Sequence, residues 1–303
     1  MALDEADVAL LEELKRDGRA SYERLGSNVG LSRTAARARL QKLIEAGTVR
    51  IEAIAHPAVA GYGTFAHVSI VTDGVPEREV ALQIAAFDNA PFVSVVAGRF
   101  SLIAELRTRD LGEMDRAVAK VRNIPGVCSL DTVIYTDIVK DSHLPLGRPD
   151  AFKSFDLDEI DRKLLALLQA DPRMPYADLA DRVGLSRAAT RARVLRLLDD
   201  GVVVVKGLVN PTAAGITQMC GFQVHLGPGS EHAAATIAAM ESVDFVARAL
   251  GRCDIIGTMI ARSRSEVSAA LNKIRSLDGV RAVEAWWHLE LIKERYSPVV
   301  RPV

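Results

Sequence analysis

Two stretches of nearly the same sequence decide the fold of this chain: GLSRTAARARLQKL at residues 30–43 and GLSRAATRARVLRL at residues 184–197. They lie inside a longer repeat, because residues 3–62 align with residues 157–216 without a gap, and about 26 of these 60 positions are identical. Equivalent residues therefore differ in number by 157 − 3 = 154. Similarity over this length indicates an internal duplication, so the two halves of the chain are expected to fold alike.

The opening 50 residues of each repeat have the pattern of three helices. Asp4 can cap the first helix, and a second is expected from Tyr22 to Val29, where Gly30 permits a tight left-handed turn. Ser32 can cap a third helix that ends at Gly47. Apolar residues recur at helical spacing along these segments, as Leu10, Leu11 and Leu14, and as Ala36, Leu40 and Leu43. A short helix, a glycine turn and a capped helix form a helix-turn-helix unit. In the second copy, Tyr176, Gly184, Ser186, Val194, Leu197 and Gly201 repeat the plan.

The rest of each half predicts strand–helix–strand–strand–helix–strand, over residues 64–72, 77–87, 92–98, 101–108, 111–123 and 128–139 in the first copy. This is the split βαβ, ferredoxin-like arrangement. The second copy matches more weakly here, with Gly98-Arg99 corresponding to Gly251-Arg252. Helices cover one face of such a sheet, so the other face needs a partner. We expect the two sheets of one chain to pack against each other, since the covalent link holds them at a high effective concentration.

The predicted fold class is α+β, with two winged-helix-type helix-turn-helix domains alternating with two ferredoxin-like βαββαβ domains. The helix-turn-helix domains are expected at residues 1–55 and 156–208, and the βαββαβ domains at residues 60–142 and 214–297. A linker is expected at residues 143–155, where His143 to Pro149 breaks both patterns.

The composition is that of a globular protein, with 303 residues, 49% hydrophobic and 25% charged. No apolar run approaches the roughly 20 residues that span a bilayer, and the acidic N-terminus lacks the features of a secretory signal. Three scattered cysteines favour a reducing compartment, so we expect a cytoplasmic protein. The formal net charge of −1 gives no overall sign of a nucleic-acid partner, so any such sign must be local.

The third helix of each copy carries a local positive charge that indicates a nucleic-acid partner. Its basic residues come without an acid before Glu45 or Asp199. Arg33 and Arg37 lie one turn apart near the N-terminal end, where a recognition helix meets base edges. Arg39 and Lys42 lie off that face and suit phosphates. An ordinary solvated helix face is the alternative interpretation. The residues predicted to contact double-stranded DNA are Ser32, Arg33, Thr34, Arg37, Arg39, Lys42, Ser186, Arg187, Arg191, Arg193 and Arg196.

At these residues the chain resembles the leucine-responsive regulator/AsnC (Lrp/AsnC) family. GLSRTAARARLQKLIEAGTV and GLSRAATRARVLRLLDDGVV, each preceded by LDE-x-D, are similar to that family's helix-turn-helix, and the following βαββαβ segments are similar to its effector domain. Ordinary members have one copy per chain, so this chain departs by fusing two. The resemblance implies a transcription regulator that responds to a small effector such as an amino acid, and a homo-oligomer.

The family's effector domain has a turn of the form Gly-x-aromatic-Asp between its second and third strands. The corresponding turns here are Gly98-Arg99-Phe100-Ser101 and Gly251-Arg252-Cys253-Asp254, and each departs from the pattern at one position. Asp254 could receive an effector's ammonium group, which Ser101 could not balance, so we expect the second site to favour an amine. A turn residue that bonds its own backbone is the alternative interpretation of Asp254. The predicted effector-binding residues are Gly98, Arg99, Ser101, Gly251, Arg252, Cys253 and Asp254.

Other residues give weaker signals. The six histidines His56, His67, His143, His225, His232 and His288 show no spacing suited to a metal, so we interpret them as structural and expect neither metal nor cofactor. Trp286 and Trp287 should point to opposite faces of the last strand.

Two other functions stay open. Siroheme decarboxylases resemble this two-domain architecture, but residues 88–93 contain no histidine and both recognition helices keep their arginines. An architectural DNA-binding protein without an effector is the other alternative.

Overall fold

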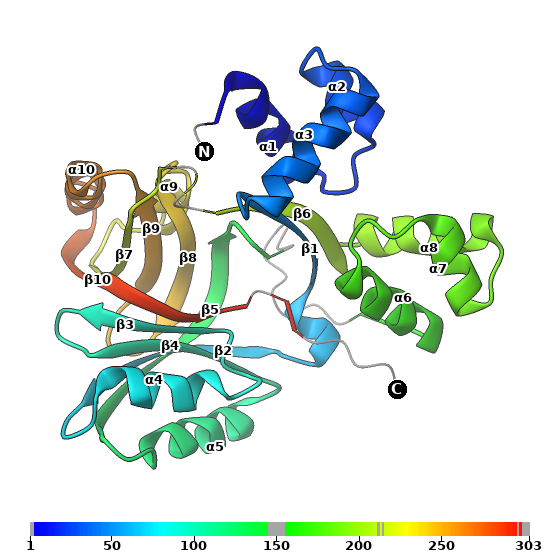
Figure 1. Ribbon diagram of the computed structural model, residues 1–303. Helices are drawn as coiled ribbons and strands as arrows, with labels where there is room; N and C mark the ends of the chain where they lie inside the picture. The colour runs from blue at the N-terminus through cyan, green and yellow to red at the C-terminus, as the bar shows by residue number, and fades with distance from the viewer. Residues whose placement is uncertain (1–2, 145–154, 211–212, 214, 296, 299–303) are drawn as a thin grey trace. The chain divides into compact units, whose positions relative to one another are not determined.

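The computed structural model describes residues 3–144, 155–210, 213, 215–295 and 297–298 (Figure 1). The chain forms two compact units, each built from both halves of the sequence. The first unit contains Met1–His56 and Phe155–Ile216, and the second contains Pro57–Ser154 and Thr217–Pro298. The two helix-turn-helix segments therefore lie in one unit, and the two βαββαβ segments lie in the other. Most of the predicted linker, at residues 145–154, lies outside the described residues.

The first unit holds two three-helix copies. The first copy consists of α1 (Glu5–Arg16), α2 (Tyr22–Asn28), α3 (Arg33–Glu45) and β1 (Val49–Ala55), and the second of α6 (Glu159–Ala170), α7 (Tyr176–Val183), α8 (Arg187–Asp199) and β6 (Val203–Val209). The expected caps are present, since the Ser32 and Ser186 hydroxyls accept the backbone N–H of Ala35 and Ala189. The turn glycines Gly30 and Gly184 have φ of 69° and 70°. The predicted apolar stripe of the first copy is buried, with Leu10, Leu14, Leu40 and Leu43 at its centre.

The strand that follows each third helix pairs with its counterpart in the other copy. β1 and β6 are antiparallel, and the central pair of their register is Glu52 with Lys206. These two residues are equivalent, because 52 + 154 = 206, and the pair Val49–Val209 mirrors Ala55–Val203 about them. A pseudo-twofold axis therefore passes between Glu52 and Lys206 and relates α3 to α8.

The second unit contains two βαββαβ copies. The first copy has a short 3-10 helix (Pro57–Ala60), β2 (Thr64–Thr72), α4 (Glu77–Ala85), β3 (Phe92–Ala97), β4 (Leu102–Thr108), α5 (Leu111–Arg122) and β5 (Val127–Asp141). The second has β7 (Gln218–Leu226), α9 (Ala233–Ala238), β8 (Val243–Leu250), β9 (Ile255–Ala261), α10 (Arg264–Arg275) and β10 (Val280–Glu294). The long last strands β5 and β10 each pair with the other copy, β5 with β8 and β10 with β3, so that eight strands close into a barrel.

Three apolar clusters follow from this arrangement. In the first copy, α4 and α5 cover the outer face of their sheet over Val68, Ile70 and Leu106, as Figure 1 shows for these helices. α9 and α10 cover the second sheet over Phe222 and Val224. The inner faces of the two sheets meet in a third cluster that includes Phe65, Val133, Ile256 and Trp286. The expected packing of sheet on sheet within one chain is therefore present, because each inner face would otherwise expose apolar side chains. Among the described residues, no helix is long and apolar enough to cross a membrane.

Candidate functional site

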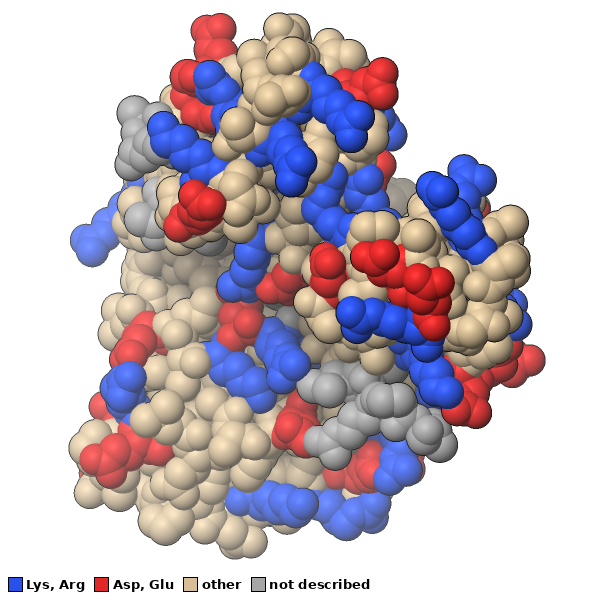
Figure 2. Space-filling view, turned by 45° about the vertical axis from the view of Figure 1, so that its right-hand side comes forward, with Lys and Arg blue, Asp and Glu red and all other residues tan. Residues whose placement is uncertain are grey.

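The paired helices α3 and α8 present four arginines at their N-terminal ends. Arg33, Arg37, Arg187 and Arg191 are exposed, and neither helix has an acid in its first turn. Among the described residues no carboxylate forms an ion pair with any of the four; Arg37 lies 6.0 Å from the ring centre of Tyr22. Figure 2 shows Lys and Arg side chains on the surface of the helix-turn-helix copies, with Asp and Glu side chains among them. Thr34 and Lys42 are exposed as well, so this surface offers cations and hydrogen-bond donors to an anion.

Three of the predicted DNA-contacting arginines have another role. Arg39 Nη1 lies 3.0 Å from Asp7 Oδ1 and also bonds Asp4, and Arg193 forms the equivalent pairs with Asp158 and Asp161. Arg196 binds Asp161 too. The Arg39 hydrogen bond, followed by the backbone N–H of Asp7, holds the pKa of Asp4 below its usual value. These arginines fasten the third helix of each copy to the cap of its first helix. Their guanidinium groups therefore have carboxylate partners within the protein, and their contact with DNA, which for Arg39 was expected at phosphates, stays a prediction.

The predicted effector turns lie between β3 and β4 and between β8 and β9. The Ser101 hydroxyl accepts the backbone N–H of Thr72 at 3.2 Å, and the Asp254 carboxylate accepts that of Leu226 at 2.7 Å. Gly98 and Gly251 have φ of 156° and 142°, and an added Cβ would lie 3.2 Å from Trp286 and 3.3 Å from the Thr132 carbonyl.

The remaining turn residues are also held by the fold. Arg252 lies 2.8 Å from Asp131 and stacks over Phe100, which Arg99 approaches as well. Cys253 is buried, and burial raises its pKa to about 12. The turn residues thus have structural partners in both copies.

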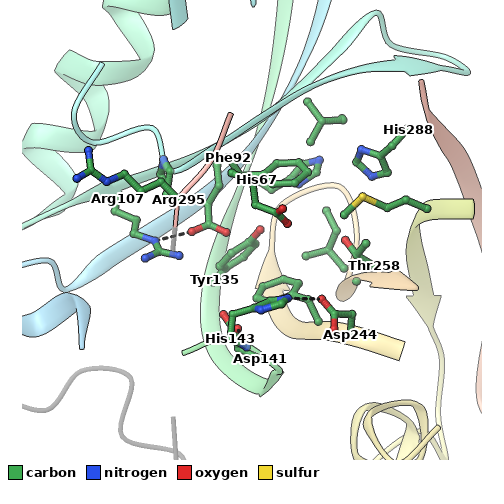
Figure 3. A pocket seen from close by; sticks show the side chains of 18 of the residues that line it. His67, Phe92, Arg107, Tyr135, Asp141, His143, Asp244, Thr258, His288 and Arg295 are labelled. Carbon is green, nitrogen blue, oxygen red and sulfur yellow. Dashed lines mark hydrogen bonds and ion pairs between the residues drawn. The ribbon is translucent and has the colours of Figure 1, made fainter. Parts of the chain in front are cut away.

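A polar cluster that sequence reasoning missed lies inside the barrel (Figure 3). All eight strands contribute to a cavity of about 70 Å³. Aromatic walls come from Phe92, Phe245 and Trp286, and polar side chains come from His67, Glu105, Arg107, Tyr135, Asp141, His143, Asp244, Thr258 and His288. Tyr135 and His288 occupy equivalent places on β5 and β10, since 135 + 153 = 288. The cavity therefore lies where the two copies meet.

Burial controls the charges of this cluster. It lowers the pKa of His67 to about 3 and that of His288 to about 4, so both rings are neutral near pH 7. Burial also raises the pKa of Glu105, although Arg107 Nε lies 2.6 Å from its carboxylate. At His143, burial disfavours the charged form, but the hydrogen bond to Asp244 at 3.1 Å and the negative charges of nearby carboxylates together outweigh burial and raise the pKa.

The tautomer of His288 follows from its neighbours. Ser94 Oγ lies 3.0 Å from the Glu290 carbonyl and 3.0 Å from His288 Nδ1; when it donates its proton to the carbonyl, it accepts from Nδ1. His288 Nε2 is then a lone-pair acceptor, and it is buried without a hydrogen-bond partner among the described residues. An unsatisfied buried acceptor is unfavourable, so the cavity favours a ligand or water with a donor group.

Three histidines that we interpreted as scattered structural residues, His67, His143 and His288, thus meet in one cavity. Their positions in sequence gave no sign of this, because each lies on a different segment of the barrel. The described residues nevertheless contain no group of three or more His, Cys, Asp or Glu side chains suited to a metal ion. The expectation for the tryptophans is confirmed, since Trp286 belongs to the inner cluster and Trp287 packs against the outer one.

Three protein-family profiles match the chain. Residues 3–44 match the AsnC-type helix-turn-helix domain, residues 65–145 match the Lrp/AsnC ligand binding domain, and residues 157–204 match a winged helix-turn-helix DNA-binding family. An HTH-type transcriptional regulator of Pyrococcus abyssi is 31% identical over 140 residues, which cover 46% of this chain and 89% of that protein. A second regulator of the same organism is 33% identical over 144 residues, covering 46% of this chain and 96% of that protein.

Solved structures of a siroheme decarboxylase resemble the whole chain. The siroheme decarboxylase NirDL, in complex with an iron-uroporphyrin III analogue, has a TM-score of 0.70 and covers 98% of this chain and 95% of its own, at 15% identity. Identity this low shows a shared fold and no more. The two Pyrococcus regulators are more similar in sequence and match this chain over almost their full length. Together with the AsnC-type and Lrp/AsnC profiles, they show that this chain belongs to the Lrp/AsnC family of helix-turn-helix transcriptional regulators.

Proposed function

We propose that this chain is a sequence-specific DNA-binding transcription regulator that reads DNA with both α3 and α8 and responds to a small effector. The observation that carries the proposal is the pair of pseudo-symmetric helices whose exposed N-terminal arginines have no carboxylate partner in the part of the chain that the structure describes. A twofold pair of recognition helices suits the twofold symmetry of an inverted repeat in DNA. The fold brings both into a single chain, where family members with one copy need two.

Within this surface we assign base contacts to Arg33, Arg37, Arg187 and Arg191, because an arginine fork can bond guanine with two donors. Lys42 and the N-terminal turns capped by Ser32 and Ser186 suit phosphates. The two helices differ at Thr34 and Ala188 and at Gln41 and Leu195, so the two half-sites need not be identical.

The effector has two candidate places. The turns at Ser101 and Asp254 are the positions that the family resemblance predicts, although their polar groups already serve the fold. The barrel cavity offers a buried acceptor at His288 together with nearby charges of both signs, which suits a small amphoteric molecule such as an amino acid. We propose the cavity as the effector site. We also propose that whole chains form homo-oligomers, independently of where the effector binds.

The enzyme alternative is less well supported. The fold is shared with a siroheme decarboxylase, but a cavity of about 70 Å³ has no room for a four-ring macrocycle without movement of the barrel. The exposed arginines on both recognition helices favour DNA reading.

Selection of genomic DNA fragments by the full chain tests the proposal. We expect a small set of sequences with two related half-sites. Replacement of Arg33 or Arg187 by alanine should cost about 1–3 kcal/mol of binding free energy and relax preference at one base pair. Specific binding that survives alanine at Arg33, Arg37, Arg187 and Arg191 together would overturn the assignment.

A further inference from the structure

Two equivalent arginines, Arg19 and Arg173 (19 + 154 = 173), link the two copies of the first unit. Each lies in the loop between the first and second helices of its own copy, and its guanidinium reaches the same loop of the other copy. Arg19 donates to the carbonyl oxygen of Pro172 at 2.7 Å and to that of Met174 at 2.9 Å.

Arg173 makes the reciprocal bonds. It donates to the carbonyl oxygens of Gly18 at 2.6 Å and Ala20 at 2.8 Å. Since 18 + 154 = 172 and 20 + 154 = 174, the four hydrogen bonds form two matching pairs about the pseudo-twofold axis. The planar fork of arginine, with donors in a fixed geometry, suits two carbonyls held side by side in this way.

Each guanidinium also stacks on a tyrosine of the other copy. Arg19 lies 5.1 Å from the ring centre of Tyr176, and Arg173 lies 4.7 Å from that of Tyr22. The two arginines are fixed at their backbones as well, because Asp17 and Asp171 accept their N–H groups at 2.9 and 3.0 Å. The loop backbone that carries each arginine is therefore held within its own copy.

We call the contacts that Arg19 and Arg173 make across the two copies the clasp. Through Tyr22, the clasp is also connected to a recognition helix. Tyr22 is the first residue of α2, and its ring lies 6.0 Å from the guanidinium of Arg37 on α3 as well. Close backbone packing adds to the clasp. The Gly18 N–H donates to the Val205 carbonyl at 2.8 Å, and a Cβ on Gly18 would lie only 2.9 Å from the Lys206 nitrogen.

We propose that the clasp joins the two helix-turn-helix copies into one rigid DNA-reading head, so that a single chain selects an inverted repeat with one half-site spacing. Arg19 and Arg173 are then positioning residues, which determine spacing selectivity without touching DNA. This inference rests on the proposed DNA-reading function. One added base pair rotates a half-site by about 35° and moves it by about 3.4 Å, so helices held at one separation cannot follow the change.

The test uses the full chain and duplexes carrying the sequence selected from genomic DNA, with the spacer changed by one or two base pairs. Wild-type protein should lose at least about tenfold in affinity per base pair of change, because the DNA must be deformed to fit. The variant Arg19→Lys/Arg173→Lys keeps both charges but loses the fork, and should reduce that discrimination at least about threefold. Its affinity for a duplex with one half-site, and its base preference there, should stay unchanged.

Arg16→Lys is the matched control, because Arg16 is exposed and bonds Glu13 of its own helix. Melting curves confirm that each variant is folded, and the single variant Arg19→Lys replaces the double variant if that one is not. Spacing discrimination equal to wild type in the folded lysine variant would overturn the clasp, as would a wild type that accepts every spacer equally. Failure to select any specific sequence would instead overturn the proposed function, and this inference with it.

Discussion

Ser101 and Asp254 occupy equivalent turns and make the same hydrogen bond. Each side-chain oxygen accepts a backbone N–H from the first strand of its sheet, from Thr72 in one copy and from Leu226 in the other, where 72 + 154 = 226. The difference between serine and aspartate, which in sequence suggested two diverged effector sites, is thus accompanied by a shared structural role.

We therefore predict similar losses of stability from Ser101→Ala and Asp254→Ala, about 1 kcal/mol each in the free energy of unfolding, because each leaves one N–H without its acceptor. Asp254→Ser, which retains an oxygen, should lose less. Urea denaturation measures all three. A loss of effector binding from Asp254→Ser at unchanged stability would restore the turn as the effector site.

The barrel cavity predicts a spectroscopic signal for effector binding. In the Trp287→Phe background, Trp286 is the remaining tryptophan and lines the cavity. Titration with a panel of amino acids should change its emission and raise the melting temperature, since a ligand that binds only the folded state stabilises it. His288→Phe, which removes the buried acceptor, should weaken that binding, whereas Asp254→Ser should not. The reverse order would place the effector at the turn.

Because Arg39 and Arg193 form ion pairs within the protein, we expect their substitution to lower folding stability without changing base preference. Arg39→Met should destabilise the fold at pH 7 and leave base preference unchanged, whereas Arg33→Met should do the opposite. The pKa of Asp4 is lowered in the fold, so the stability that it contributes is present above its usual value near 4 and is lost as the pH falls through the lowered value. The stability difference between wild type and Arg39→Met should accordingly shrink toward pH 3. A constant difference would show that the ion pair is not its cause.

Because buried histidines are neutral in the folded protein, we expect its stability to decrease at acidic pH. The pKa of His67 falls from 6.5 to about 3 on folding, so the unfolded chain binds a proton first as the pH drops. Stability is therefore unaffected above about pH 6.5 and decreases below it, by about 2 kcal/mol between pH 6.5 and 5 for this group. Urea unfolding at pH 7.5 and 5 should show this loss, and His67→Phe should reduce it. His232, which is exposed on the N-terminal side of α9, provides the control variant His232→Gln.

Much of the fold could be predicted from the sequence, because its signals are local. The caps at Ser32 and Ser186, the glycine turns at Gly30 and Gly184 and the apolar stripes of the helices depend on residues within a few positions of each other. The repeat at an offset of 154 residues predicted two similar halves of the chain, and the arginines without neighbouring acids indicated the recognition helices. Apart from the repeat, each of these features can be seen in a window of about twenty residues.

Tertiary structure decided which charged and polar groups remain available. Arg39 looks like Arg33 in sequence, but its charge is compensated by Asp4 and Asp7 on α1. Arg19 and Arg173 look like ordinary loop arginines until the copies are brought together, and His67 and His288 lie more than 200 residues apart before the barrel closes. Contacts between distant segments determine the partners and the burial of a side chain, and no local sequence pattern contains these contacts. Electrostatic and hydrogen-bond energies depend on the partners and on the burial.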